Sequence, residues 1–199
     1  MNIKAVGFDY GGVVGIHKSV MPDISAAINL PVDEIRTVYL KYNRLANVGG
    51  RSYQEVWKMV LDELGRGEFS DTVNKLLAVN DAIVLNDDVL NLVHELRDKG
   101  IRVGLLTNNT SYNGEALRKV GLADHFDSFF VSAEIGYQKP ELEAFKVLFD
   151  SLGASFEESA YIDDAPSSLR LAGEIGYHPI LFTSYDQLRK ELISLGVLE

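Results

Sequence analysis

The sequence predicts an α/β fold with a parallel sheet, helices on both faces of the sheet and one helical insertion. Strand and helix patterns alternate from residue 83 to residue 199, which implies right-handed crossovers between parallel strands. The strand segments are short, nearly continuous apolar runs, as expected of strands buried on both faces. Residues 16–82 interrupt the alternation with helical patterns alone. We therefore expect a three-layer, Rossmann-like core domain of residues 1–15 and 83–199, and a helical cap domain of residues 16–82.

The core begins with an apolar strand over residues 3–9, which a glycine turn follows. A helix is expected over residues 86–100, because Asn86 can cap it, apolar residues recur on one face and Gly100 can end it. The other expected strands span residues 101–106, 126–131, 160–162 and 179–182. Four other helices are expected. One ends near Gly121, one runs from Pro140 to Gly153 with Leu142 facing inward, one runs from Pro166 to Gly176, and the last starts at about Tyr185. Proline is expected at the first position of two helices because its missing N–H is not needed there.

The insertion is expected to contain three helices, over residues 33–42, 53–64 and 71–79. Because it leaves the chain directly after the first strand, we expect it to pack over the edge of the sheet as a lid. The alternative is a helical subdomain that only adds stability.

Composition narrows the class of protein. The chain has 199 residues, of which 46% are apolar and 24% charged, as in a globular domain with a sizeable core. It has no apolar run long enough for a membrane span, no signal-peptide pattern and no cysteine. We therefore expect a cytoplasmic protein without a membrane partner. The net charge of −10 argues against nucleic acid as the main partner, and the oligomeric state is left open.

Polar side chains gather at the ends of the expected strands. They are Asp9, Thr107, Asn108, Asp163 and Asp164, with Lys139 just before a helix. In an open parallel sheet these positions share the carboxyl edge, where ligands bind. Three carboxylates placed together repel one another unless a cation lies among them, and oxygen ligands with an open position suit Mg²⁺. Thr107 and Lys139 could then bind a phosphate and neutralise charge in the transition state.

The chain resembles the haloacid dehalogenase-like (HAD) hydrolases in four motifs that occur in the family's order. These are Phe8-Asp9-Tyr10-Gly11-Gly12-Val13, Leu105-Leu106-Thr107-Asn108, Lys139-Pro140 and Tyr161-Ile162-Asp163-Asp164. The insertion is similar to the small helical cap of the family's first cap class (C1), and the segment Gly50-Arg51-Ser52-Tyr53 with Trp57 looks like one common in those caps. The resemblance spans essentially the whole chain.

The resemblance implies a nucleophile and a metal site. Asp9 would attack phosphorus and form an aspartyl-phosphate, which water then hydrolyses. Mg²⁺ would be held by Asp9, by the backbone carbonyl of Gly11 and by Asp164, with Asp163 as a further ligand or as a partner of the ligands. The implied protein is a Mg²⁺-dependent phosphohydrolase.

The resemblance also implies the groups that bind the substrate. Thr107 and Asn108 would bind the phosphoryl oxygens, while Lys139 would orient Asp9 and stabilise charge. Gly12 would let backbone N–H groups approach the phosphate because no side chain blocks them. The expected substrate is a small phosphorylated metabolite, since the cap is short. Arg44 and Arg51 could meet a second anionic group of that substrate, although arginines at such positions are more often solvated.

Gly11 departs from the pattern of the family, whose phosphatases mostly carry Asp there. That acid protonates the leaving oxygen, and its loss removes a contribution of about 10²–10⁴-fold. One interpretation is a substrate with a good leaving group, such as a sugar 1-phosphate or an acyl phosphate. Another is a substitute acid, for which His17 is the candidate and Tyr10 a weaker one. The third is a catalytically weak or inactive protein that binds a phosphorylated ligand.

Other classes fit less well. The dehalogenases of the family also lack the second acid but do not carry a pair of carboxylates in the fourth motif, as Asp163 and Asp164 do here. Relatives that cleave phosphonates need a cap lysine, for which Lys18 or Lys41 would be available. A receiver-type signalling domain carries its acid pair after the first strand and has no cap. The chain also lacks a P-loop, a dinucleotide fingerprint and a Gly-x-Ser-x-Gly elbow.

Overall fold

A computed structural model describes residues 2–16, 19–79 and 83–199. The described chain contains a five-stranded parallel sheet with the order β3-β2-β1-β4-β5. The strands are β1 (Ala5–Phe8), β2 (Arg102–Thr107), β3 (Ser128–Val131), β4 (Ser159–Asp163) and β5 (His178–Leu181). Each lies within two residues of its expected position. The predicted α/β core with a helical cap region is therefore confirmed. Among the described residues, no helix is both long and apolar enough to cross a lipid bilayer.

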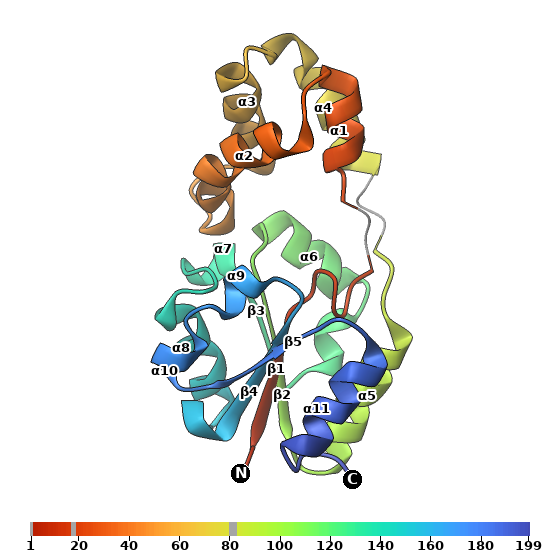
Figure 1. Ribbon diagram of the computed structural model, residues 1–199, viewed down its shortest axis with the longest axis vertical. Helices are drawn as coiled ribbons and strands as arrows, with labels where there is room; N and C mark the ends of the chain where they lie inside the picture. The colour runs from red at the N-terminus through yellow and green to blue at the C-terminus, as the bar shows by residue number, and fades with distance from the viewer. Residues whose placement is uncertain (1, 17–18, 80–82) are drawn as a thin grey trace.

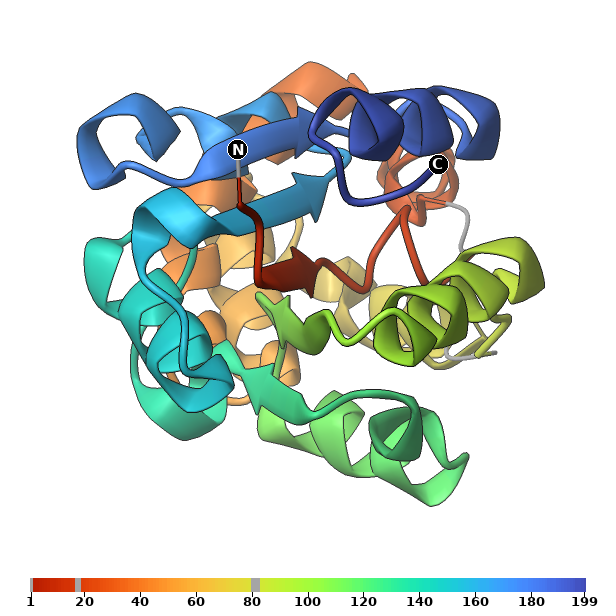
Figure 2. The ribbon, with the colours of Figure 1, turned by 90° about the horizontal axis from the view of Figure 1, so that it is seen from below.

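Helices cover both faces of the sheet, as Figure 2 shows. One face packs against α5 (Asp87–Asp98), α6 (Ser111–Lys119) and α11 (Tyr185–Ser194), and the other against α8 (Leu142–Leu152), α9 (Pro166–Leu169) and α10 (Ala172–Ile175). The remaining core elements are η2 (Leu122–His125), α7 (Ser132–Ile135) and η3 (Phe156–Glu158). Buried apolar residues on each face form one cluster, so the sheet is the middle layer of three.

Two of the expected helices differ from the structure. The helix expected from Pro140 begins at Leu142, with Glu141 as its N-cap residue, and Leu142 is 45% exposed rather than buried. Two residues before this N-cap, the backbone of Lys139 is held by the side chain of Asn108 from another loop. The helix expected from Pro166 to Gly176 is divided into α9 and α10, because Leu171 has a non-helical backbone conformation.

The insertion contains α1 (Met21–Ile28), α2 (Val32–Asn47), α3 (Tyr53–Glu63), η1 (Gly67–Phe69) and α4 (Ser70–Val79). Three of these were expected, but α1 was not. Its helical pattern is only eight residues long and carries a proline in its first turn. The four α-helices bury their own apolar cluster around Trp57 and lie above the carboxyl edge of the sheet (Figure 1). The domain boundaries at 15/16 and 82/83 stay predictions, because residues 17–18 and 80–82 lie outside the described chain.

Side chains connect the cap to the loop that precedes α8. The Arg44 guanidinium donates to Glu141 Oε1 at 2.8 Å, and the Asn47 amide donates to Gln138 Oε1 at 3.1 Å. Both donors lie near the C-terminal end of α2, and both acceptors flank Lys139 in sequence. The cap therefore contacts the core beside the predicted site.

Candidate active site

The register of the three central strands places the predicted site residues side by side. Phe8 of β1 pairs with Leu105 of β2 and with Ile162 of β4. The next residue, Asp9, donates its backbone N–H to the Ile162 carbonyl at 2.9 Å. The ends of β1, β2 and β4 therefore meet at one point of the carboxyl edge, where ligands bind in open α/β sheets.

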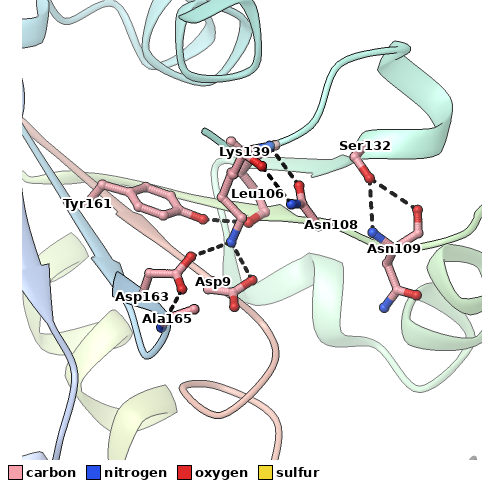
Figure 3. A network of polar contacts seen from close by, with 9 residues as sticks. All are labelled: Asp9, Leu106, Asn108, Asn109, Ser132, Lys139, Tyr161, Asp163 and Ala165. Atoms are coloured by element: carbon pink, nitrogen blue, oxygen red, sulfur yellow. Dashed lines mark hydrogen bonds and ion pairs between the residues drawn. The ribbon is translucent and has the colours of Figure 1, made fainter. Parts of the chain in front are cut away.

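Lys139 lies buried between two carboxylates at this point. Its ammonium is 2.7 Å from Asp9 Oδ1 and 2.5 Å from Asp163 Oδ2 (Figure 3). All three residues are at least nine-tenths buried. The ammonium also lies 5.2 Å from the centre of the Tyr161 ring, within cation–π range. A buried charge persists only when it is paired in this way.

The pKa values of the pair follow from this arrangement. Burial raises the pKa of the Asp9 carboxyl to about 7, and Asp163 adds to this rise, while Lys139 opposes it. Burial acts to lower the pKa of Lys139, but the two carboxylates outweigh it and hold that pKa above its ordinary value. Lys139 is therefore a cation at neutral pH, and the charge of Asp9 depends on what else binds to it. A bound cation would favour the ionised form of Asp9.

The loop that carries Lys139 is held by Asn108. The side-chain oxygen of Asn108 accepts from the Lys139 backbone N–H at 2.8 Å, and its amide donates to the Lys139 carbonyl at 3.0 Å (Figure 3). The side chain of Asn108 is thus engaged with the main chain of Lys139. That Asn108 binds phosphoryl oxygens stays a prediction, with its backbone N–H as the candidate donor.

Asp9, Asp163 and Asp164 form an acidic cluster. Each offers a carboxylate oxygen, and these three atoms lie within 4.8 Å of one another. Asp163 is fully buried, and both its oxygens have partners, since Oδ1 accepts from the Ala165 backbone N–H at 2.9 Å. Asp164 is exposed. Hard oxygen donors around a partly open position fit Mg²⁺, with Asp9 and Asp164 better placed to bind it than Asp163.

The glycine turn after β1 is built around Asp164. Gly12 has a φ of +73°, and a side-chain carbon there would lie 2.2 Å from Asp164 Oδ2. Its backbone N–H donates to the Gly15 carbonyl at 2.9 Å. The Tyr10 ring packs against Gly15, where a side-chain carbon would lie 2.4 Å from the ring, and burial raises the pKa of its phenol. Gly12 thus makes room for a carboxylate as well as for a ligand, and Tyr10 packs beside the turn.

Tyr161 is a site residue whose role the sequence did not indicate. Its hydroxyl donates to the Leu106 carbonyl at 2.6 Å (Figure 3), although β4 and β2 are separated by β1. The ring crosses β1 at Gly7, where a side-chain carbon would lie 2.6 Å from it. A glycine inside a strand often marks a close approach, and Gly7 was the available signal.

A cleft of about 740 Å³ lies over this edge, between core and cap. Its lining includes all the predicted site residues: Asp9, Gly11, Gly12, Thr107, Asn108, Lys139, Asp163 and Asp164. Thr107 ends β2 and is 3% exposed. Residues of α1, α2, α3 and α4 form the opposite wall. The predicted substitute acid His17 lies outside the described residues, as does Lys18.

Comparisons with known proteins identify the family. Residues 3–176 match the haloacid dehalogenase-like hydrolase family model, so the chain belongs to this family of hydrolases. The phosphoglycolate phosphatase of Rhodospirillum rubrum is 31% identical over 110 residues, which are 55% of this chain and 45% of that protein. The phosphoserine phosphatase of Thermus thermophilus is 36% identical over 84 residues, 40% of this chain and 34% of that protein. The chain thus spans less than half the length of these relatives.

The fold agrees with the family assignment. A HAD family enzyme from Bacteroides thetaiotaomicron, solved as a magnesium complex, superposes with a TM-score of 0.70 and 20% identity. The alignment covers 92% of this chain and 94% of that one. At this identity the likeness concerns the fold.

Proposed function

We propose that this protein is a Mg²⁺-dependent phosphohydrolase that acts on a small phosphorylated metabolite through an aspartyl-phosphate. The observation that carries the proposal is Lys139, buried between Asp9 and Asp163 with Asp164 beside them. This arrangement stands at the floor of a cleft of suitable size for a small ligand. Two relatives with phosphatase names support it. The small insertion is proposed to be a cap of the C1 class.

In the proposed reaction, an Asp9 carboxylate oxygen forms a bond to phosphorus as the bond from phosphorus to the ester oxygen breaks. The leaving oxygen departs as an anion and takes up a proton from solvent, to which the attacking water of the second step later loses one. Water then attacks the phosphorus of the aspartyl-phosphate, which releases inorganic phosphate and restores Asp9. Lys139, whose ammonium lies 2.7 Å from Asp9 Oδ1, is proposed to orient Asp9 and to offset negative charge.

The metal would be held by Asp9, by Asp164 and by the backbone carbonyl of Gly11. Asp163 is proposed as a partner of these groups rather than a direct ligand, because Lys139 and the Ala165 N–H occupy both its oxygens. When bound, Mg²⁺ would neutralise carboxylates that otherwise repel a phosphate.

The phosphoryl oxygens are proposed to bind three groups. Thr107 and Asn108 both line the cleft, and the Thr107 hydroxyl and the Asn108 backbone N–H are the first two proposed donors. Other backbone N–H groups of the turn at Gly12 would complete the set, since the absence of a side chain leaves the approach open, while the N–H of Gly12 itself donates to the Gly15 carbonyl. Each of these is a neutral donor that needs no change of charge on binding.

Gly11 sets the proposed substrate class. No side chain at position 11 can protonate the leaving oxygen, and the raised pKa of Tyr10 makes it a weak donor. We therefore propose substrates with good leaving groups, such as sugar 1-phosphates or acyl phosphates. The same observation supports the second candidate, a catalytically weak protein that binds a phosphorylated ligand. The pair Asp163 and Asp164 disfavours a haloacid dehalogenase.

A phosphate-release assay tests the proposal. Purified protein with Mg²⁺ is given a panel of alkyl phosphates, sugar 1-phosphates and acetyl phosphate, beside Asp9→Asn and the surface control Asp150→Asn. We expect release from the activated substrates, its loss in Asp9→Asn and upon chelation of Mg²⁺, and no change in Asp150→Asn. Release that survives Asp9→Asn would overturn the nucleophile assignment. No release from any substrate would favour the binding protein.

A further inference from the structure

The cap side of the cleft carries no charged side chain among the residues that the structure describes. The lining residues contributed by cap helices and the segment before them include Val20, Met21, Tyr39, Asn47, Tyr53 and Leu77. Among the described residues that line the cleft, the charged ones are Asp9, Asp163 and Asp164 against one cation, Lys139. Lys139 is already flanked by two carboxylates. A phosphoryl group and its metal would therefore meet the only charged part of the described lining.

Two described cap arginines that could have supplied a second cation are engaged elsewhere. Arg44, which could have met a second anionic group, donates to Glu141. Arg51 donates to Glu55 at 3.0 Å on the surface of α3. Neither arginine lines the cleft. A second anionic group of a substrate would lie beside three carboxylates, without a described partner, and burying a charge in that way is costly.

The cap wall offers aromatic and polar neutral surface instead. Tyr39 stacks on Trp57 with ring centres 5.2 Å apart, and Tyr53 meets the edge of Tyr39 at 6.5 Å. These ring contacts restrict the movement of the two tyrosines, both of which line the cleft. Rigid tyrosines bind ligands with apolar contact and a hydroxyl at low cost in conformational entropy.

We propose that the substrate carries a single anionic group, the phosphoryl group, on an uncharged organic part with hydroxyl or apolar surface. This inference rests on the proposed function. It excludes substrates whose leaving group carries a carboxylate, such as those of the two phosphatases named above.

The test compares matched pairs of ligands. Glucose 1-phosphate and glucuronic acid 1-phosphate share a sugar ring and a good leaving group and differ in a hydroxymethyl group against a carboxylate. We expect kcat/KM to be about tenfold or more higher for glucose 1-phosphate, because the carboxylate meets the acidic lining. An equal or higher value for the carboxylate would overturn the inference while leaving the hydrolase proposal intact.

Binding separates the inference from the chemistry. The two ligands are 3-phosphonopropionate and 3-phosphonopropionamide, which share a phosphonate and differ in a carboxylate against an uncharged amide group. Neither contains an ester bond. Their dissociation constants are measured by calorimetry on the unmodified protein with Mg²⁺. We expect the amide to bind about tenfold more tightly. If the amide binds more tightly but no phosphate is released from any substrate, the hydrolase proposal is wrong and the inference still holds. Equal binding, or binding of neither ligand, would overturn the inference.

A charge added to the lining provides a further check. Tyr112 lines the cleft from α6 and is 70% exposed, so Tyr112→Arg is expected to fold. It should reduce the preference for the amide about threefold. Val120→Arg, on an exposed position that follows the same helix but lies outside the cleft lining, adds the same charge and should leave the preference unchanged. Equal effects of the two substitutions would show that the cleft lining does not determine the preference.

Discussion

Replacing Lys139 with methionine should destabilise the fold far more than the loss of an ordinary ion pair. Methionine keeps an apolar side chain of similar length, while the charge between Asp9 and Asp163 is lost. The Lys139 side chain is 1% exposed, and its two partners are 12% and 0% exposed. Removing one partner from a buried ionic cluster costs about 3–5 kcal/mol, because the remaining charges stay buried without a counterion.

The cost should depend on pH. The pKa of Asp9 is raised by burial to about 7 in the folded protein, so Asp9 is ionised at pH 8 and protonated at pH 5. At pH 8 the variant either keeps two buried carboxylates without a cation or loses free energy of folding by protonating one of them. At pH 5 Asp9 is neutral with or without Lys139, and only Asp163 loses its partner. The loss should therefore be larger at pH 8 than at pH 5.

Urea denaturation at both pH values, with a chelator present, measures these losses. Lys146→Met is the matched control, because Lys146 pairs with Asp150 on the surface and both side chains are more than 60% exposed. Its expected cost is below about 1 kcal/mol. A loss for Lys139→Met no larger than that of Lys146→Met, or a loss independent of pH, would refute the reasoning about the buried cluster.

Three further predictions concern the same edge of the sheet. Gly12→Ala should weaken Mg²⁺ binding more than tenfold in calorimetry, because the new carbon displaces Asp164; unchanged affinity would contradict this. Tyr161→Phe should cost about 1–3 kcal/mol in urea, since the buried Leu106 carbonyl loses its donor; a neutral result would count against that hydrogen bond. Without metal, melting temperature should fall as pH rises from about 4 to about 7 and then level off, because the folded state binds an extra proton at Asp9 between the ordinary pKa of 3.8 and the raised pKa of about 7. Asp9→Asn should remove this dependence of melting temperature on pH. An unchanged dependence would show that another group causes it.

The arrangement of the site could be predicted because parallel strands end at a common edge. Apolar runs located each strand, so the residue after each run had to lie near the others. Asp9, Thr107 and Asp163 meet for this reason alone. Lys139 lies in a loop before a helix, so the strand ends did not locate it, and the expectation that it orients Asp9 came only from the family resemblance.

Contacts between side chains and distant main chain could not be predicted. The Asn108 side chain forms two hydrogen bonds with the main chain of Lys139, which lies 31 residues away in sequence. No local sequence pattern indicates such a pair. The role of Tyr161 depends on its ring crossing β1 at Gly7, which requires the strand order. The hydrophobic periodicity of the sequence did not reveal α1, because its eight residues form only about two helical turns.

The most direct test of the proposed nucleophile is to trap its phosphorylated form. The protein is mixed with Mg²⁺ and acetyl phosphate, whose leaving group needs no acid at position 11, then quenched in acid and analysed by peptide mass spectrometry. We expect one added phosphoryl group on the peptide that contains Asp9, located on Asp9 by fragmentation and absent from Asp9→Asn. Phosphate release without a modified Asp9, or a phosphoryl group on another residue, would contradict the proposed mechanism.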